Sequence, residues 1–273
     1  MAASESEKSS HQISGCLVCG QELVYGKNEK LECFYCHKVF DSNTKCKEGH
    51  YVCDKCHSLP GNDLIETYCI ATKLKDPLEL ALTLMRNPRM KMHGPEHHFL
   101  VPAVLLAAYY NIKGDEKSKK LKIEEARLRS SRVLGGFCGF YGDCGAAVGT
   151  GIFISLITNS TPLSKREWKL SNLMTAKSLL AMANHGGPRC CKRNTFLAID
   201  EAVNFLRENF GITMVIDRNL VCEFKELNKE CLKRKCPYYP KNQQERAGRN
   251  QSCKERATGT RMTKATPVTN KVV

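Results

Sequence analysis

Cysteine and histidine residues near the start of the sequence stand in four closely spaced pairs. Two or three residues between the members of a pair let both side chains reach one tetrahedral ion, with zinc–sulfur distances of ~2.3 Å. The eight ligands complete two four-ligand sites, so we expect two structural zinc ions without an open coordination position. The pairs are Cys16 and Cys19, Cys33 and Cys36, Cys46 and His50, and Cys53 and Cys56.

These four pairs can combine in two ways. They share ions in sequence order, or they interleave, with the first pair joining the third and the second joining the fourth. The run CKEGHYVCDKC resembles the middle of RING-type and related cross-brace zinc fingers, although the final CxxC of that family is missing. His37 and His57 directly follow CxxC pairs and are alternative ligands that we rank below the eight.

A second centre is expected at residues 135–151, GGFCGFYGDCGAAVGTG, where glycines and two cysteines are concentrated. Glycines this dense let the backbone approach a ligand or another backbone closely. Asp143 is the expected N-cap of the following helix, with Cys144 as its first residue. The positive field of a helix start favours the thiolate form of such a cysteine. Cys138 lies on the same loop, six residues earlier.

Two adjacent cysteines, Cys190 and Cys191, begin a later helix and have cations beside them. Arg189 and Arg193 would stabilise thiolates or hold an anionic substrate. Neighbouring cysteines bond each other only with strain, but they offer two thiolates to a soft metal. We therefore expect these cysteines and the 135–151 loop to be the two halves of one site.

Histidines also gather at the start of a helix, in residues 92–98, MHGPEHH. His93 and His97 are candidates for binding a metal or moving protons. The alternative is a capped helix start with partly solvated histidines. Because so many cysteines lack an assigned role, we include both histidines as acid–base or ligand groups of the second site.

Three further cysteines, Cys222, Cys231 and Cys236, follow the last long predicted helix. Cys236 precedes a proline, as the last ligand of some iron–sulfur runs does. These thiols either complete the site just described or form a third metal site with Cys253 or a histidine.

The order of motifs over residues 16–240 resembles an uncharacterised family of prokaryotic cysteine-rich proteins. Its pattern is a CxxC zinc module followed by HGPEHH, GGFCGxxGxCGAAxGTG and GGPRCCKR, and its members are often labelled SAM-dependent methyltransferases. More distantly, Cys138, the later CGA run and the Cys190–Cys191 pair resemble the C-GCAxxG-C-C family, to which redox chemistry is assigned. Ala146 stands where that family has its second motif cysteine.

The composition indicates a globular chain with one sizeable core and a small module. Of the 273 residues 42% are hydrophobic, 16 are cysteines, and the formal net charge is +14. The N-terminus is polar, and the longest apolar runs fall short of the ~20 residues that a membrane helix needs. We therefore expect a cytoplasmic protein, in which CxxC pairs bind metal instead of forming disulfides.

The fold that we predict is mostly α, with a small zinc-binding module that contains short β structure and an α-helical bundle with a minor β-hairpin. The hairpin is expected at residues 212–221, and a capping box of Ser164 and Glu167 is expected to begin a long helix. The predicted parts are a disordered leader (1–15), the double-zinc module (16–58), a connector (59–75), the cysteine-rich helical domain (76–240) and a basic disordered tail (241–273).

Three functions remain open, and the sequence does not decide whether the chain is an enzyme. The favoured one is a zinc protein with an added iron–sulfur or other thiolate–metal site, serving redox or sulfur-transfer chemistry with a small-molecule or protein partner. The first alternative is methyl transfer from SAM, with Gly145 and Gly149 in the cofactor loop, although no predicted strand precedes that loop. The second alternative is a non-catalytic zinc adaptor that contacts protein, or nucleic acid through its basic tail.

Overall fold

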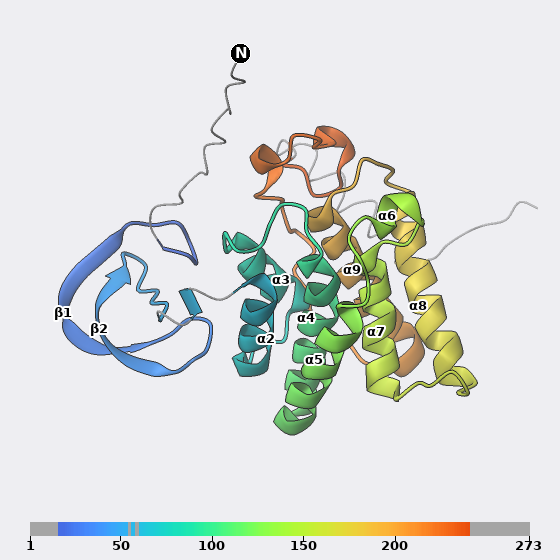
Figure 1. The fold of residues 1–273 in the computed structure, drawn as a ribbon, viewed down its shortest axis with the longest axis horizontal. Coiled ribbons are helices and arrows are strands. Elements are labelled where there is room, and N and C mark those ends of the chain that lie inside the picture. The colour runs from blue at the N-terminus through green and yellow to red at the C-terminus, as the bar shows by residue number, and fades with distance from the viewer. Residues whose placement is uncertain (1–15, 54–55, 58–59, 241–273) are drawn as a thin grey trace, which may run out of the picture.

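The computed structural model describes residues 16–53, 56–57 and 60–240, so the predicted leader and tail and Cys253 lie outside the described residues. A small two-stranded module lies to one side of a larger group of helices (Figure 1). This mostly helical fold confirms the predicted class. The elements are β1 (Leu23–Glu32), β2 (Val39–Cys46), α2 (Gly61–Ala71), α3 (Pro77–Arg86), α4 (Glu96–Lys113), α5 (Glu116–Ser130), α6 (Phe137–Phe140), α7 (Gly145–Thr158), α8 (Arg166–Ala183), α9 (Cys191–Phe210) and the 3-10 turns η1 (Lys225–Leu227) and η2 (Lys233–Lys235).

Helix α4 is the centre of the helical part, because its sequence is apolar on almost every face. It packs against α2, α3, α5, α7 and α9, and Figure 1 shows it among these helices. Residues 99–108 of this helix are buried. Helix α7, which was expected to be central, packs against α4, α5, α8 and α9. Two apolar helices side by side therefore form the core on which the cysteine-bearing loops rest.

Glycines of α7 let this helix approach its neighbours closely. A Cβ on Gly149 would lie 2.8 Å from Cδ of Pro102 and 3.0 Å from the carbonyl oxygen of His98 on α4. A Cβ on Gly151 would lie 2.1 Å from Oγ1 of Thr175 on α8. Only hydrogen fits at these positions, so these glycines serve helix packing.

The zinc module and the helices share one continuous core. Tyr35 of the module is fully buried, and its ring meets that of Tyr68 on α2 edge-on at a centroid distance of 5.8 Å. Phe34 stacks on the same tyrosine at 6.0 Å. The segment 59–75 was expected to be a connector, but it contains α2, whose apolar residues and Cys69 are buried. Cys69 is thus the small buried hydrophobe that the sequence indicated.

Two helices begin differently from the prediction, although the helices themselves are present. Cys144 is the N-cap of α7 in place of Asp143, and the helix begins at Gly145. Helix α8 has Lys165 at its N-cap position without a side-chain cap, so the expected capping box is absent. The hydroxyl of Ser164 instead accepts a hydrogen bond of 3.0 Å from the backbone N–H of Thr161 in the preceding turn.

The β-hairpin expected at residues 212–221 is also wrong, since no strand is assigned to that segment. The side chains of this segment contact the helices, and its backbone does not pair with itself as a hairpin would. Met214 is buried, and Arg218 forms an ion pair of 2.9 Å with Asp200 on α9. Packing on α9 thus replaces strand pairing as the interaction that holds this extended chain.

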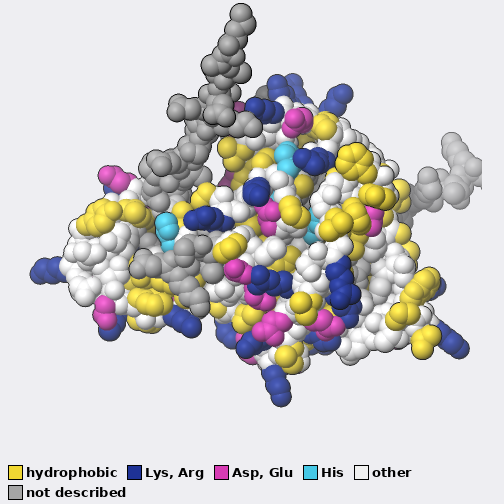
Figure 2. Space-filling view, in the orientation of Figure 1, with side chains coloured by type: hydrophobic (Ala, Val, Ile, Leu, Met, Phe, Trp, Pro, Cys, Tyr) yellow, Lys and Arg dark blue, Asp and Glu magenta, His cyan; other side chains and the backbone are white. Residues whose placement is uncertain are grey.

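Charged side chains of both signs alternate over α2 and α5, in the lower middle of Figure 2. Arg127 on α5 pairs there with Asp63 and Glu66 on α2. This charged face is solvated and carries none of the candidate site residues. None of the helices in the described part of the chain has the length and apolar character that a membrane crossing requires.

Candidate metal centres and the adjoining pocket

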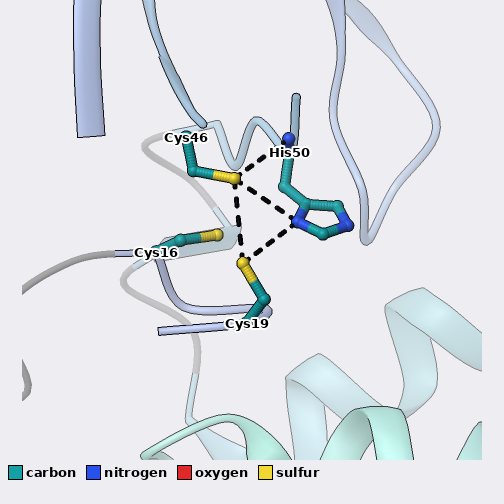
Figure 3. A group of neighbouring side chains, drawn as sticks. All are labelled: Cys16, Cys19, Cys46 and His50. Carbon is teal, nitrogen blue, oxygen red and sulfur yellow. Dashed lines mark hydrogen bonds between the residues drawn. The ribbon is translucent and has the colours of Figure 1, made fainter. Parts of the chain in front are cut away.

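Four ligands converge beside the β-hairpin in the first metal centre (Figure 3). A tetrahedral zinc ion with zinc–sulfur distances of ~2.3 Å holds two sulfurs about 3.8 Å apart. The sulfurs of Cys19 and Cys46 lie 3.8 Å apart. Nδ1 of His50 lies 3.3 Å from the first of these sulfurs and 3.4 Å from the second. Together with Cys16, these groups have the spacing of a closed metal site.

The second metal centre has only cysteine ligands, and Sγ of Cys36 lies 3.9 Å from Sγ of Cys53. The set is Cys33, Cys36, Cys53 and Cys56. The first pair therefore joins the third and the second joins the fourth, which is the interleaved alternative. His37 bonds Glu32 at 2.6 Å and, like His57, belongs to neither group. The module thus contains two four-residue groups with the geometry to hold a metal ion.

Burial makes some of these thiols dependent on a cation. It raises the pKa of Cys16 to about 11 and raises that of Cys56 further, whereas hydrogen bonds outweigh burial and lower the pKa values of Cys33 and Cys46. A bound divalent metal replaces the thiol proton and removes this penalty. The donor set of thiolates and one imidazole suits zinc, and metal binding would supply folding free energy to this small module.

Four other cysteines line one cavity at the N-terminal end of α9. We call it the four-thiol cavity. Cys190 is the N-cap of α9, and the other three belong to the segment that carries η1 and η2. The volume of this cavity is about 20 Å³. Its cysteines are Cys190, Cys222, Cys231 and Cys236.

Backbone N–H groups point at three of these sulfurs. Donors two or three residues further along the chain reach Cys190, Cys222 and Cys231 at 3.4 Å each. The same local turn occurs in the zinc module, where the N–H of Val18 lies 3.4 Å from Sγ of Cys16. Such hydrogen bonds stabilise negative charge on a ligand sulfur. The local backbone is therefore folded for thiolate ligands.

The sulfurs of the four-thiol cavity are spaced more widely than a single zinc ion requires. Among the described residues, only the two groups of the N-terminal module bring three or more ligand atoms within 4.8 Å of one another. Burial raises the pKa of Cys222 to about 11 and also raises the pKa values of Cys190 and Cys236. These groups thus have the donor type of a metal site.

Two buried cations stand beside the four-thiol cavity. Lys192 is 1% exposed, and its ammonium donates to the carbonyl oxygens of Met90, at 3.2 Å, and Met85, and lies 4.9 Å from the ring centroid of Phe224. Burial lowers the pKa of this lysine to about 8. Arg193 is 4% exposed. Neither cation forms an ion pair among the described residues, but the buried Glu96 is near enough to Lys192 to offset part of the lowering of its pKa. Negative charge on the thiols would add to this compensation.

A larger hollow of about 500 Å³ adjoins this cavity, and we call it the glycine-loop pocket. Cys138 and Cys144 line it on the side of the glycine-rich loop, and Arg189 lines it on the other side. The amide of Asn194 donates to Sγ of Cys144 at 3.4 Å. Arg193 lines both hollows. The predicted single site is therefore divided, with Cys190 in one hollow and Cys138 and Cys144 in the other.

The remaining candidates lie around these two hollows. Cys191 is partly buried, and burial raises its pKa to about 11. His93 lies 3.3 Å from the side-chain oxygen of Asn228 through Nε2. His97 is 1% exposed, lies 3.1 Å from the carbonyl oxygen of Gly94 through Nδ1, and has a buried Nε2 without a partner among the described residues. Burial holds the pKa of His97 well below its usual range.

Gly145 and Gly149 face α4, which is the helix-crossing alternative to their predicted role in cofactor binding. A Cβ on Gly145 would lie within 2.5 Å of three ring atoms of His98. Sequence reasoning did not identify Asn194, because an asparagine on an apolar helix carries no motif. It joined Cys190 to the three C-terminal cysteines only as one of two alternatives, the other being a third metal site with Cys253 or a histidine.

Comparison with known proteins shows the family. Residues 65–239 match the model of a family described as a family of unknown function, DUF5714. The chain belongs to this family. No curated protein and no solved structure matches the chain. The matched segment of this DUF5714 protein begins within α2, so it contains both the four-thiol cavity and the glycine-loop pocket but not the ligands of the zinc module.

Proposed function

We propose that this protein holds two structural zinc ions and one iron–sulfur cluster of the [4Fe–4S] type, and that it serves redox or sulfur-transfer chemistry in the cytoplasm. The observation that carries the proposal is the four-thiol cavity of Cys190, Cys222, Cys231 and Cys236. Four cysteine thiolates are the ligand set of such a cluster. The cytoplasm suits it because thiols stay reduced there.

The spacing of the sulfurs argues against a third zinc ion. The two zinc sites hold neighbouring sulfurs 3.8 and 3.9 Å apart, as one tetrahedral ion requires. In the four-thiol cavity, no three sulfurs all lie within 4.8 Å of one another. The same is true of every other described cysteine outside the zinc module. A four-iron cube separates its thiolates more widely than one ion does, because each thiolate binds a different iron.

The charges around the cavity support the same proposal. A [4Fe–4S] cluster in its oxidised form with four thiolates has a formal charge of about −2. Lys192 and Arg193 are buried beside the thiols, and the buried Glu96 lies near Lys192. The two cations would offset part of the cluster charge. When bound, the cluster would supply one-electron transfer or labile sulfur beside the glycine-loop pocket.

The two other functions have less support. A SAM-dependent methyltransferase of the doubly wound type needs a parallel sheet, whereas the described residues contain a single antiparallel pair of strands. Gly145 and Gly149 lie within α7, which follows the short helix α6 instead of a strand. An adaptor that binds nucleic acid would depend on the tail, residues 241–273, and would leave the four-thiol cavity without a role.

Metal and acid-labile sulfide analysis of protein purified without oxygen tests the proposal, together with its absorption and electron paramagnetic resonance spectra. We expect about two zinc ions, four irons and four sulfides per chain. Ser substitution of Cys190, Cys222, Cys231 or Cys236 is expected to remove iron and sulfide while both zinc ions stay. Cys69→Ser and Cys138→Ser are the controls that keep the cluster.

Two results would contradict this assignment. One is a third equivalent of zinc with no visible absorption. The other is iron that survives all four substitutions but is lost from Cys138→Ser, which would return the cluster to the glycine-rich loop.

A further inference from the structure

The glycine-loop pocket is open to solvent and is large enough for a small molecule, since ligand sites commonly measure ~300–1,000 Å³. We propose that it binds a small organic anion, with the carboxylate or phosphate end at Arg189 and the rest of the molecule beside the thiol of Cys144. This inference deepens the proposed function by naming the substrate class. Its test does not depend on the cluster.

The charge of the pocket selects an anion. Arg189 and Arg193 both line it, and no Asp or Glu is among the described residues that do so. Asp143 is adjacent to Cys144 in sequence but is not part of the lining. A pocket with low-dielectric walls and one sign of charge concentrates ligands of the opposite sign.

The buried side chain of Arg193 supports the anion-binding end of the pocket through hydrogen bonds. The guanidinium of Arg193 donates through Nη2 to the carbonyl oxygens of Gly186, at 2.9 Å, and Pro188, at 3.1 Å. Its Nε donates to the side-chain oxygen of Asn194. These bonds fix the turn that carries Arg189. The exposed arginine therefore stands on a rigid support and remains free to bind.

Part of the pocket lining is apolar and suits the body of an organic molecule. Leu179, Met182 and Ala183 of α8 form it, and Phe140 of α6 stands 88% exposed at the same pocket. An exposed aromatic side chain at a pocket rim offers area for a ligand at little entropic cost. Inorganic ions alone would leave this surface uncovered.

The reactive group of the pocket is the thiol of Cys144. Asn194 donates to its sulfur at 3.4 Å, and the residue caps the N-terminus of α7, where backbone N–H groups are unpaired. The amide of Asn194 thus donates to a sulfur that lines the same hollow as Arg189. A ligand held by the arginine would be placed beside this sulfur.

Competing alkylation by iodoacetate and iodoacetamide tests the inference on the full chain with its metals. The two reagents deliver groups of nearly equal size and differ in charge. We expect the ratio of the iodoacetate rate to the iodoacetamide rate at Cys144, quantified by peptide mass spectrometry, to exceed that of a free cysteine peptide several-fold. Arg189→Gln should lower this ratio to the free value and leave the iodoacetamide rate unchanged.

Controls separate local binding from the general positive charge of the protein. Arg166→Gln removes one exposed cation at the start of α8 and should leave the ratio high. Inorganic phosphate and butyrate, added separately, should slow the iodoacetate reaction, and the stronger competitor identifies the preferred anionic end.

The inference is overturned if Cys144 shows no preference for iodoacetate, or if Arg189→Gln and Arg166→Gln change the ratio equally. The metal content of the same samples reports on the cluster, so a failed anion preference with iron present would leave the proposed function intact.

Discussion

The side-chain amide of Asn87, at the end of α3, donates a hydrogen bond of 2.9 Å to the hydroxyl of Tyr35 in the zinc module. The tyrosine donates its own proton to the carbonyl oxygen of Leu17 at 3.2 Å. Both side chains are buried, and burial raises the pKa of Tyr35, so the hydroxyl stays protonated. One hydroxyl thus joins the first zinc-binding loop to the helical domain, and we expect the two parts to unfold together.

Tyr35→Phe removes only this hydroxyl and keeps the ring. It leaves the buried amide of Asn87 without its acceptor, which should lower the free energy of unfolding by about 1–3 kcal/mol. Chemical denaturation of the metal-loaded protein measures this loss. Tyr25→Phe is the matched control, because that tyrosine is 72% exposed, and equal effects of the two changes would refute the coupling.

The interleaved zinc sites predict which cysteines one substitution exposes. Cys46→Ala should release one of two zinc ions and make Cys16 and Cys19 reactive, because these three residues share an ion. The cysteines of the other site should stay protected from alkylation. Zinc analysis and peptide mapping after iodoacetamide treatment measure both effects. Exposure of Cys53 and Cys56 in place of the first pair would indicate sequential pairing.

The candidate metal ligands could be predicted from spacing, because the two members of each pair are near one another along the chain. Their partners could not be chosen, since Cys19 and Cys46 meet only through the turn of the β-hairpin. The members of the four-thiol cavity were harder to predict, because they too are brought together by tertiary structure. Cys190 lies far in sequence from Cys231, and only the return of the C-terminal segment over α9 unites them.

The helical fold could be predicted from apolar periodicity, whereas the local details depended on tertiary contacts. The sequence of Ser164 and Glu167 fits a capping box, but the hydroxyl instead completes the preceding turn with Thr161. Similarly, β-branched residues at 212–216 indicated a strand, but packing of Met214 into the core replaces strand pairing. Local propensity is a weak guide where a segment covers the end of a helix.

Gly149→Ala tests the close crossing of α4 and α7. The added methyl group would meet Cδ of Pro102 and a backbone oxygen of α4, and neither can move without shifting the helix. We expect a loss of about 1–3 kcal/mol in the free energy of unfolding, as for overpacked cores. Thermal and chemical denaturation measure it. Gly135→Ala is the control, because a Cβ there meets no atom within 4 Å. Equal stability of both variants would contradict this packing.

The buried imidazole of His97 predicts a loss of stability in mild acid. Burial first, and then the nearby Lys192, hold its pKa well below the usual value, so the folded protein keeps this side chain neutral. The unfolded chain takes up a proton below pH ~6.5. Because the unfolded state then binds more protons than the folded state, the free energy of unfolding falls as the pH falls.

Between pH ~6.5 and ~5.5 this linkage amounts to about 1 kcal/mol. Denaturation curves of the wild type, His97→Gln and His37→Gln at both pH values provide the measurement. The second histidine is exposed and bonded to Glu32, so its variant is the matched control for general acid effects such as weaker zinc binding. His97→Gln should lose about 1 kcal/mol less stability than the wild type over this interval. An equal loss in all three proteins would show that the imidazole of His97 does take up a proton in the folded state.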